Sequence, residues 1–264
     1  MKTSSEWLRY YQQNPDQLLH IPWYLGAELT AEERAAITRS VQEFQLGESS
    51  EGRHLLLDAA DYAARTGDHL YLQTMRLFIA EEQRHAADLA RFLQLNGLPV
   101  VQSTWGDCVF RQARNLFPGL ELSITVLVCA ELIAKVYYAA LRKATGSLIL
   151  QRLCEQILRD EVSHVAFQTE QLARLRARRG RSAHAITMAA QRLAYLGAVC
   201  VVWVSHRRVM QRAGMDATGW WKACWREFGP AFSRALRAQA RAAVAGESGE
   251  ARPARSAFAA EGPM

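Results

Sequence analysis

The chain has 264 residues, half of them hydrophobic, only seven prolines and a formal net charge of +6. This length can bury a full-sized core, and stretches rich in Ala, Leu, Arg, Glu and Gln favour an all-α protein. Five dispersed cysteines without a Cys-x-x-Cys pair argue against a disulfide framework, and the N-terminus lacks a secretory hydrophobic run, so we expect a cytoplasmic protein with reduced thiols.

Residues 1–29 are rich in aromatic side chains and show no clear hydrophobic period. Two prolines, Pro15 and Pro22, interrupt regular structure in this region. The aromatic residues are Trp7, Tyr10, Tyr11, Trp23 and Tyr24. We therefore expect an irregular N-terminal arm that packs on the body of the protein through these rings.

The first long helix is predicted to begin at Thr30, because Thr30 and Glu33 form a capping box ahead of an apolar stripe. The helical pattern continues to about Arg65. It passes through Gly47 and Gly52, where we expect a kink.

A turn is predicted at 66–68, with Asp68 capping a second helix that ends near Asn96. The next 20 or so residues, 97–118, show no regular pattern. A connection of that length is explained if it crosses the full length of a helical bundle. Further helices are predicted at about 119–144, 148–179, 183–212 and 217–243, followed by a disordered tail at 246–264.

The third predicted helix has an unusual acidic residue. Residues 122–141 are apolar almost all the way round, yet Glu131 lies near their middle. A helix that is hydrophobic on every side lies inside a protein or a membrane. A carboxylate placed there is desolvated at a cost of several kcal/mol unless it is compensated. The sequence thus predicts a positive partner for Glu131, and a metal ion is the preferred candidate.

Two Glu-x-x-His motifs supply further metal-binding side chains. Glu82 with His85, and Glu161 with His164, each place a carboxylate and an imidazole on one face of a helix. The second motif follows the first by 79 residues. One such motif could arise by chance, whereas two at equivalent places in a repeat indicate a functional site.

The same separation of 79 residues relates the Thr-Gly pairs at 66–67 and 145–146. The chain therefore contains two helical hairpins that are built alike. Two hairpins joined by one long crossover make a four-helix bundle of ferritin-like connectivity, which we predict for residues 30–180. The helices of 181–245 are expected to pack on this bundle.

Over residues 30–180 the chain resembles the ferritin-like di-metal carboxylate superfamily, which includes rubrerythrins, ribonucleotide reductase small subunits and di-iron oxygenases. The motifs that carry the resemblance are Gly47-Glu48-Ser49-Ser50-Glu51, Glu82-Gln83-Arg84-His85, Glu131 and Glu161-Val162-Ser163-His164. The resemblance implies two iron ions, with manganese or an iron–manganese pair as alternatives that the same ligand types accept. Two divalent ions would balance four carboxylates that could not otherwise ionise together. The implied ligands are Glu48, Glu82, His85, Glu131, Glu161 and His164.

The ligand on the first helix is open between Glu48 and Glu51. Alignment of the two hairpins matches Glu131 with Gly52, and Glu48 lies one turn earlier on nearly the same face. The Gly-Glu opening, which is similar in rubrerythrins, also favours Glu48. Glu51, in contrast, reproduces more closely the spacing between a Glu and the following Glu-x-x-His motif. Glu48 is preferred, with Glu51 as the alternative.

Several other polar residues lie near the predicted ligands. Tyr138, two turns beyond Glu131 on the same face, is either ordinary core or a partner of the metal site. Gln168 is expected to line the site. Lys135 either pairs with a ligand carboxylate or extends outward, and the outward orientation is preferred. His206, which precedes two arginines, is expected at the surface or an interface.

Two stretches bear on possible partners. Five arginines between residues 174 and 181 could attract nucleic acid, but they lie at a predicted helix end, where we expect them to be solvated without a nucleic-acid partner. The most lipid-like run, 193–204, is shorter than the roughly 20 residues that span a bilayer. We interpret it as a buried helix or a homodimer contact, with no membrane span.

The resemblance implies a redox enzyme in which two irons use O2 or peroxide to oxidise a small, apolar organic substrate. The alternatives are iron handling or peroxide scavenging, as in ferritins and rubrerythrins, and a helical binding protein without turnover. The aromatic arm and the additional helices favour the enzyme, because they could wall a pocket. Without a Cys-x-x-Cys pair the chain lacks a rubredoxin-like centre of its own, so we expect an external electron donor.

Overall fold

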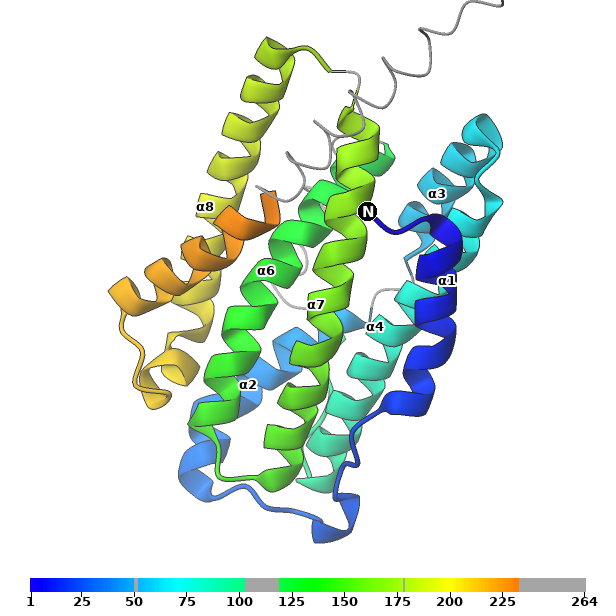
Figure 1. Ribbon diagram of the computed structural model, residues 1–264. Coiled ribbons are helices and arrows are strands. Elements are labelled where there is room, and N and C mark those ends of the chain that lie inside the picture. Colours follow the sequence, from blue (N-terminus) through cyan, green and yellow to red (C-terminus); the bar gives the residue numbers. More distant parts are fainter. Residues whose placement is uncertain (50–51, 103–118, 178, 233–264) are drawn as a thin grey trace, which may run out of the picture.

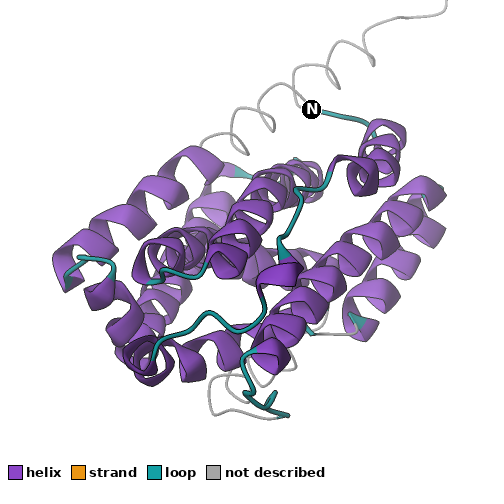
Figure 2. Cartoon of the chain, turned by 90° about the horizontal axis from the view of Figure 1, so that it is seen from below, coloured by secondary structure: helices purple, strands orange, loops and turns teal. Residues whose placement is uncertain are grey.

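The computed structural model describes residues 1–49, 52–102, 119–177 and 179–232, and in these ranges the regular structure is entirely helical. Figure 2, seen from below and coloured by secondary structure, shows helices joined by loops. The prediction of an all-α protein is confirmed. The longer helices are α1 (Ser4–Gln13), α2 (Ala31–Glu48), α3 (Arg53–Thr66), α4 (His69–Leu95), α6 (Leu120–Ala144), α7 (Leu148–Arg176), α8 (Arg181–Arg212) and a helix at 217–232.

Four helices, α2, α4, α6 and α7, surround the middle of the molecule, an arrangement compatible with a helical bundle. Helix α6 packs along α7 and α2 along α4, while α4 also contacts α7 and α2 contacts α6. In Figure 1, α6 and α7 run side by side through the centre, with α8 at one edge and α1 and α3 at the other. The core includes Ile37, Phe78, Leu132 and Leu153, each almost fully buried. Such burial contributes roughly 1.5–3 kcal/mol for each large side chain.

The predicted helix starts are confirmed. Thr30 and Glu33 form a reciprocal capping box at the start of α2. Asp68 accepts a hydrogen bond from the Tyr71 N–H at the start of α4, and Ser147 does the same for Leu150 in α7. These side chains satisfy N–H groups that have no partner within the helix.

The helix expected from Thr30 to Arg65 is divided in two. Helix α2 ends at Glu48 and α3 begins at Arg53. Gly52, which caps α3, has φ +61°, a left-handed conformation that favours glycine. A Cβ atom at this position would lie only 2.5 Å from Cδ1 of Ile79 on α4. Gly52 thus allows both the turn and the close approach of the chain to α4.

The N-terminal arm is more regular than predicted, because residues 4–13 form α1. Thr3 caps this helix in a second reciprocal capping box with Glu6. Trp7 and Tyr11, one turn apart on the same face, are buried, and α1 packs on α4. The sequence signal that reveals the helix is the Thr-x-x-Glu spacing from Thr3 to Glu6 rather than the hydrophobic period.

The helix at 217–232 packs across α8 and α6. The Trp220 indole N–H donates to the Val199 carbonyl, and the Tyr195 hydroxyl donates to the Cys224 carbonyl. Glu227 of the same helix pairs with Lys135 of α6, and Figure 1 shows this orange segment next to α8 and near α6. Residues 233–243 of this predicted helix and the predicted tail lie outside the described residues.

Two helices, α6 and Ser182–Arg212 of α8, are long and apolar enough to cross a membrane by length and composition. Such a pair is weak evidence, because the core helix of a soluble protein passes the same test. Most of α6 lies inside the protein, whereas 22% of the most apolar window of α8 is buried. Ile186 and Leu193 of α8 are each 71% exposed. The prediction of no membrane span stays a prediction.

The arginine cluster at the end of α7 is only partly solvated, contrary to expectation. Arg176 is buried, its Nε donates to Glu121 of α6, and its Nη1 donates to Gln191 of α8. Arg179 also donates to Glu121. Arg178 lies outside the described residues. The sequence indicated a charged helix end. It did not indicate that α6 places the Glu121 carboxylate opposite that end.

Candidate metal centre

The helices bring all six preferred ligand residues into the interior. Glu48 is the last residue of α2, Glu131 lies in the middle of α6, and the two Glu-x-x-His motifs lie on α4 and α7. Glu82 is half-buried and the other five are buried. Glu51, the alternative to Glu48, lies outside the described residues, so the structure places only Glu48 of this pair.

Five of the six side chains form two overlapping groups that could each hold a metal ion. Glu48, Glu82 and His85 make one group, and Glu82, Glu161 and His164 make the other. Within each group, one potential ligand atom from every residue lies within 4.8 Å of the others. Glu82 belongs to both groups, so its carboxylate would be a ligand in each of them.

Glu131 lies beside the second group. Burial and then the charge of Glu131 raise the pKa of Glu161, and Glu131 Oε1 accepts a hydrogen bond from Gln168 Nε2. Gln168 therefore lines the site as predicted. Lys135, one turn from Glu131, forms an ion pair with Glu227 of the 217–232 helix, which agrees with the prediction that it extends outward.

The fit of these residues to metal ions can be tested by their unpartnered atoms. A buried polar atom without a hydrogen bond costs roughly 1–3 kcal/mol, so such atoms are rare in native proteins. In the described part of the chain, five of the predicted ligand residues each have one buried atom of this kind. These atoms are Glu82 Oε1, His85 Nδ1, Glu131 Oε2, Glu161 Oε2 and His164 Nδ1.

Three of these atoms, on Glu82, Glu161 and His164, also lie close to one another. His164 Nδ1 lies 2.8 Å from Glu82 Oε1 and 3.9 Å from Glu161 Oε2, without the alignment of a hydrogen bond. Carboxylate oxygens and imidazole nitrogens are ligands that iron, manganese and zinc accept. Metal ions would give all five unpartnered atoms a partner, so the residues fit the predicted group.

The other nitrogen of each histidine is held by a carboxylate from the opposite hairpin. His85 Nε2 lies 2.9 Å from Asp160 Oδ2, and His164 Nε2 lies 2.9 Å from Glu81 Oε2. A carboxylate that accepts from Nε2 fixes the ring and leaves Nδ1 free for a metal. The two hairpins are thus connected crosswise, each motif supporting the histidine of the other.

Sequence reasoning missed Glu81 and Asp160, although a signal was present. Each directly precedes the Glu of its motif, so the repeat contains an acidic pair followed by a histidine: Glu81-Glu82-x-x-His85 and Asp160-Glu161-x-x-His164. Adjacent residues on a helix point about 100° apart, so the first acid cannot share the face of the second. The pairing of each first acid with a histidine becomes visible only when α4 and α7 are placed together.

Asp160 is held by several donors. Arg84 Nη2 lies 2.8 Å from Oδ2, and Gln156 Nε2 contacts both carboxylate oxygens at 3.0 and 2.9 Å. Burial alone would raise the pKa of Asp160, but hydrogen bonding and the charge of His85 outweigh it, so this pKa lies well below its usual range. Asp160 is therefore a stable anion facing His85.

The acidity of the predicted ligands depends on their burial and on one another. Burial raises the pKa of Glu48, Glu131 and Glu161 well above the usual range, and nearby carboxylates add to this effect. Glu82 differs, because the charge of His164 outweighs its burial and lowers its pKa to about 2. The pKa of His164 is correspondingly raised by Glu82 and Glu81, against the effect of burial. In the absence of added cations the site cannot hold all four carboxylates as anions.

Tyr138 contacts the site directly. Its hydroxyl donates to Glu48 Oε1 at 2.7 Å, so this buried ring is a hydrogen-bonding partner of a predicted ligand. Phe44, one turn before Glu48 on α2, packs edge-on against the Tyr138 ring with centroids 5.5 Å apart. These contacts fix the end of α2 at the point where the helix must present its carboxylate.

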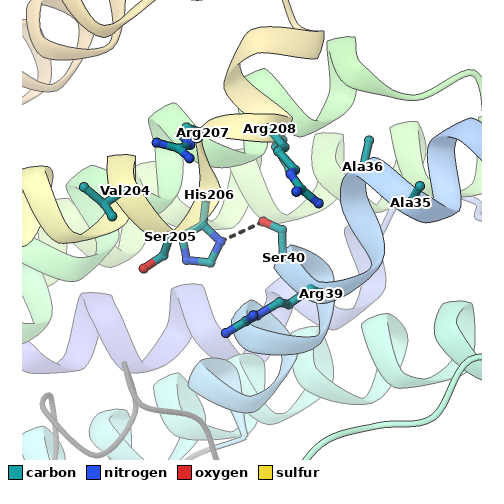
Figure 3. A pocket seen from close by; sticks show the side chains of 10 residues that line it. Ala35, Ala36, Arg39, Ser40, Val204, Ser205, His206, Arg207 and Arg208 are labelled. Atoms are coloured by element: carbon teal, nitrogen blue, oxygen red, sulfur yellow. Dashed lines mark hydrogen bonds between the residues drawn. The ribbon is translucent and has the colours of Figure 1, made fainter.

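A separate cavity of about 310 Å³ lies between α2 and α8, lined by residues that include Arg39, Ser40 and His206. Figure 3 shows the His206 ring directed at Ser40, whose hydroxyl lies 2.8 Å from His206 Nδ1 and also 2.8 Å from the Tyr137 hydroxyl. His206, which was predicted at the surface or an interface, is buried, and burial lowers its pKa to about 4. Arg39, which flanks the cavity, pairs with Glu43.

Comparison of the chain with protein-family models, curated proteins and solved structures gives no match. The assignment of the centre therefore depends on its own geometry. That geometry is a buried cluster of glutamates and histidines that could bind metal and is compatible with a di-iron site.

Proposed function

We propose that this chain is a ferritin-like di-metal carboxylate oxidoreductase that uses O2 or peroxide to oxidise a small, apolar organic substrate. The observation that carries the proposal is the convergence of five unpartnered ligand atoms from α4, α6 and α7 at one buried place. The crosswise pairs of His85 with Asp160 and His164 with Glu81 support it, because they orient both imidazoles for metal binding.

The ferritin-like arrangement is supported by the order of the ligands along the chain. A single Glu on α2 precedes the motif on α4, and a single Glu on α6 precedes the motif on α7. A Glu from each of two helices with a Glu-x-x-His from each of the other two is the ligand set of di-iron and di-manganese bundles.

When bound, the two irons would supply the redox chemistry, reducing O2 or peroxide at the expense of the organic substrate and an external donor. The residues of the chain would hold the pair and control its surroundings. The Glu82 carboxylate is placed between the two groups. Glu81 and Asp160 would accept hydrogen bonds from Nε2 of the histidines, so that each neutral ring offers the lone pair of Nδ1 to a metal ion.

The surroundings of the centre would exclude bulk water. Val128 and Leu132, which flank Glu131 on α6, are almost fully buried. On α4, Phe78 packs edge-on against the His164 ring with centroids 4.8 Å apart. An apolar enclosure suits an apolar substrate and limits side reactions of the oxidant with water.

The test is reconstitution of the purified protein with Fe(II) under anaerobic conditions, followed by stopped-flow mixing with O2. We expect two irons per chain and a transient absorption whose decay is faster with an apolar substrate. Glu161→Gln should lose the transient, whereas Glu155→Gln, which removes a carboxylate paired with Arg142 and Arg152 nearer the surface of α7, should keep it. Fewer than one iron per chain in the wild type would contradict the proposal. Loading of many irons per chain would support iron storage instead.

A further inference from the structure

The N-terminal arm contributes a side chain to the surroundings of the metal centre. Asn14, at the end of α1, is 5% exposed. Its Nδ2 donates to Glu81 Oε1 at 2.6 Å and to Asp160 Oδ1 at 3.0 Å. These are the two carboxylates that hold His164 and His85, so one amide group links the supports of both histidines.

We propose that Asn14 is a positioning residue of the metal centre, and that docking of the arm and binding of metal stabilise each other. The proposal deepens the proposed function and rests on the metal centre described above. An amide NH2 group has two N–H donors, and here each is directed at a different carboxylate. Hydrogen bonds to charged acceptors are stronger than neutral ones, so this contact holds both carboxylates firmly.

The two carboxylates do not depend on Asn14 equally. Asp160 also accepts from Arg84 and from Gln156. For Glu81, among the described residues, Oε1 has a hydrogen bond from Asn14 and Oε2 faces the histidine. Loss of Asn14 therefore frees Glu81 most, and the half of the centre that contains His164 should be affected more than the half that contains His85.

The rest of the arm reinforces this link. The Tyr11 ring lies against the His164 ring, with centroids 6.2 Å apart. The Trp7 indole N–H donates to Glu170 of α7 at 2.9 Å, which anchors the arm further along the bundle. Because a docked arm stabilises the histidine supports, metal binding must by reciprocity stabilise the docked arm.

The first experiment compares Asn14→Ala with Asn96→Ala by anaerobic titration with Co(II), which reports each site optically. Asn96 is a matched control, since it is also a buried Asn that ties the N-terminal segment to α4. It accepts from the N–H groups of Glu28 and Leu29 and donates to the Phe92 carbonyl, without contacting the carboxylates of the centre. We expect Asn14→Ala to weaken binding of one of the two ions by about 10–100-fold, the usual effect of removing such a support, and Asn96→Ala to leave both affinities unchanged.

A second variant keeps the test valid if Asn14→Ala folds poorly. Asn14→Asp retains the shape of the side chain but replaces both N–H donors with an oxygen, and it should weaken the same ion. Equal Co(II) affinity in wild type and both Asn14 variants would overturn the proposal, as would an equal loss in Asn96→Ala.

The second experiment measures the arm directly, by the rate of tryptic cleavage after Arg9, which is exposed on α1. Co(II) should slow this cleavage in the wild type and have no effect on it in Asn14→Ala. Cleavage that is independent of Co(II) in the wild type would overturn the coupling. If the wild type binds two Co(II) ions but its iron-loaded form does not react with O2, only the proposed function is contradicted. A wild type that binds no metal would contradict both.

Discussion

Glu81 Oε2 lies 2.9 Å from His164 Nε2, although the two residues belong to different halves of the sequence repeat. The equivalent pair, Asp160 with His85, has the same separation. Neither hairpin therefore contains a complete histidine site, because each imidazole needs a carboxylate from the other hairpin. Both pairs therefore require α4 to pack against α7.

The first prediction concerns this crosswise support. Asp160→Ala removes the acceptor that holds His85 Nε2, so metal affinity should fall by about 10–100-fold, the range found for other outer ligand partners. The measurement is Co(II) titration. Asp58→Ala, which removes a carboxylate that bonds Ser123 between α3 and α6, is the control and should bind Co(II) as the wild type does.

The predicted ligands show how far local sequence reasoning extends. Helical periodicity places Glu161 and His164 on one face, and the apolar surroundings of Glu131 indicate burial, so these residues could be selected without a structure. The structure brings them together, and their metal binding stays a prediction. The role of Glu81 could not be predicted, since spacing along one helix does not tell which helix packs opposite.

The same limit explains the residues that were placed wrongly or missed. Asn14 reaches Glu81 and Asp160 across 67 and 146 positions of sequence, a relationship that no local pattern encodes. His206 was expected at the surface or an interface because arginines follow it, but α2 places Ser40 against its ring. In both cases a polar side chain is buried because a distant helix supplies its partner.

The second prediction separates metal binding from stability. Burial raises the pKa of Glu131, so the metal-free fold must either protonate this carboxyl or bear its unpaired charge. Glu131→Gln keeps an acceptor for Gln168 but removes the charge. The metal-free variant should be more stable than the wild type by about 1–2 kcal/mol, and the gain should grow as the pH rises above the usual carboxyl range. Its metal content should fall below two ions per chain.

Urea unfolding of the metal-free proteins and metal analysis of the reconstituted proteins check this prediction. A variant that is less stable than the wild type at pH 8 would show that Glu131 is compensated within the fold. A variant that still binds two ions would show that Glu131 is not a ligand.

The third prediction uses two neighbouring tyrosines as a matched pair. The hydrogen bond from Tyr138 lowers the pKa of Glu48. Tyr138→Phe removes this bond and so makes the Glu48 carboxyl harder to ionise, and Co(II) affinity should fall severalfold. Tyr137→Phe removes a hydrogen bond of similar length to Ser40 on the same helix, without touching Glu48. It should reduce stability by about 0.5–1.5 kcal/mol and leave Co(II) affinity unchanged. Equal affinities in the two variants would contradict a role for Tyr138 in the centre.

The fourth prediction resolves the first-helix ligand. Glu48 lies in a group with Glu82 and His85, so Glu48→Ala should disrupt the metal pair. Glu51→Ala should leave a pair that is recognisable in the optical spectrum of the Co(II) or iron protein. The opposite result would identify Glu51 as the ligand. The spacing between each Glu and the following Glu-x-x-His motif would then be a better guide than the Gly-Glu resemblance.

The last prediction concerns the pH dependence of stability and needs no metal. Burial lowers the pKa of His206 to about 4, Glu43 acts against this shift, and Arg39 adds to it. In the unfolded chain the pKa is about 6.5. Between these values the unfolded chain binds a proton that the native ring does not, so His206 favours folding above about pH 6.5 and this contribution is lost as the pH falls toward 4. From pH 7 to pH 5 the loss amounts to about 2 kcal/mol.

His206→Gln should remove that part of the pH dependence, and urea unfolding at pH 7 and pH 5 measures it. Carboxylates of the centre also have pKa values that folding shifts, so the informative quantity is the difference between variant and wild type at each pH. His20→Gln, at an exposed position of the arm, is the control and should unfold as the wild type does at both pH values. If His206→Gln and the wild type lose the same free energy of unfolding between pH 7 and pH 5, the His206 ring is not held neutral by its contact with Ser40 and α2.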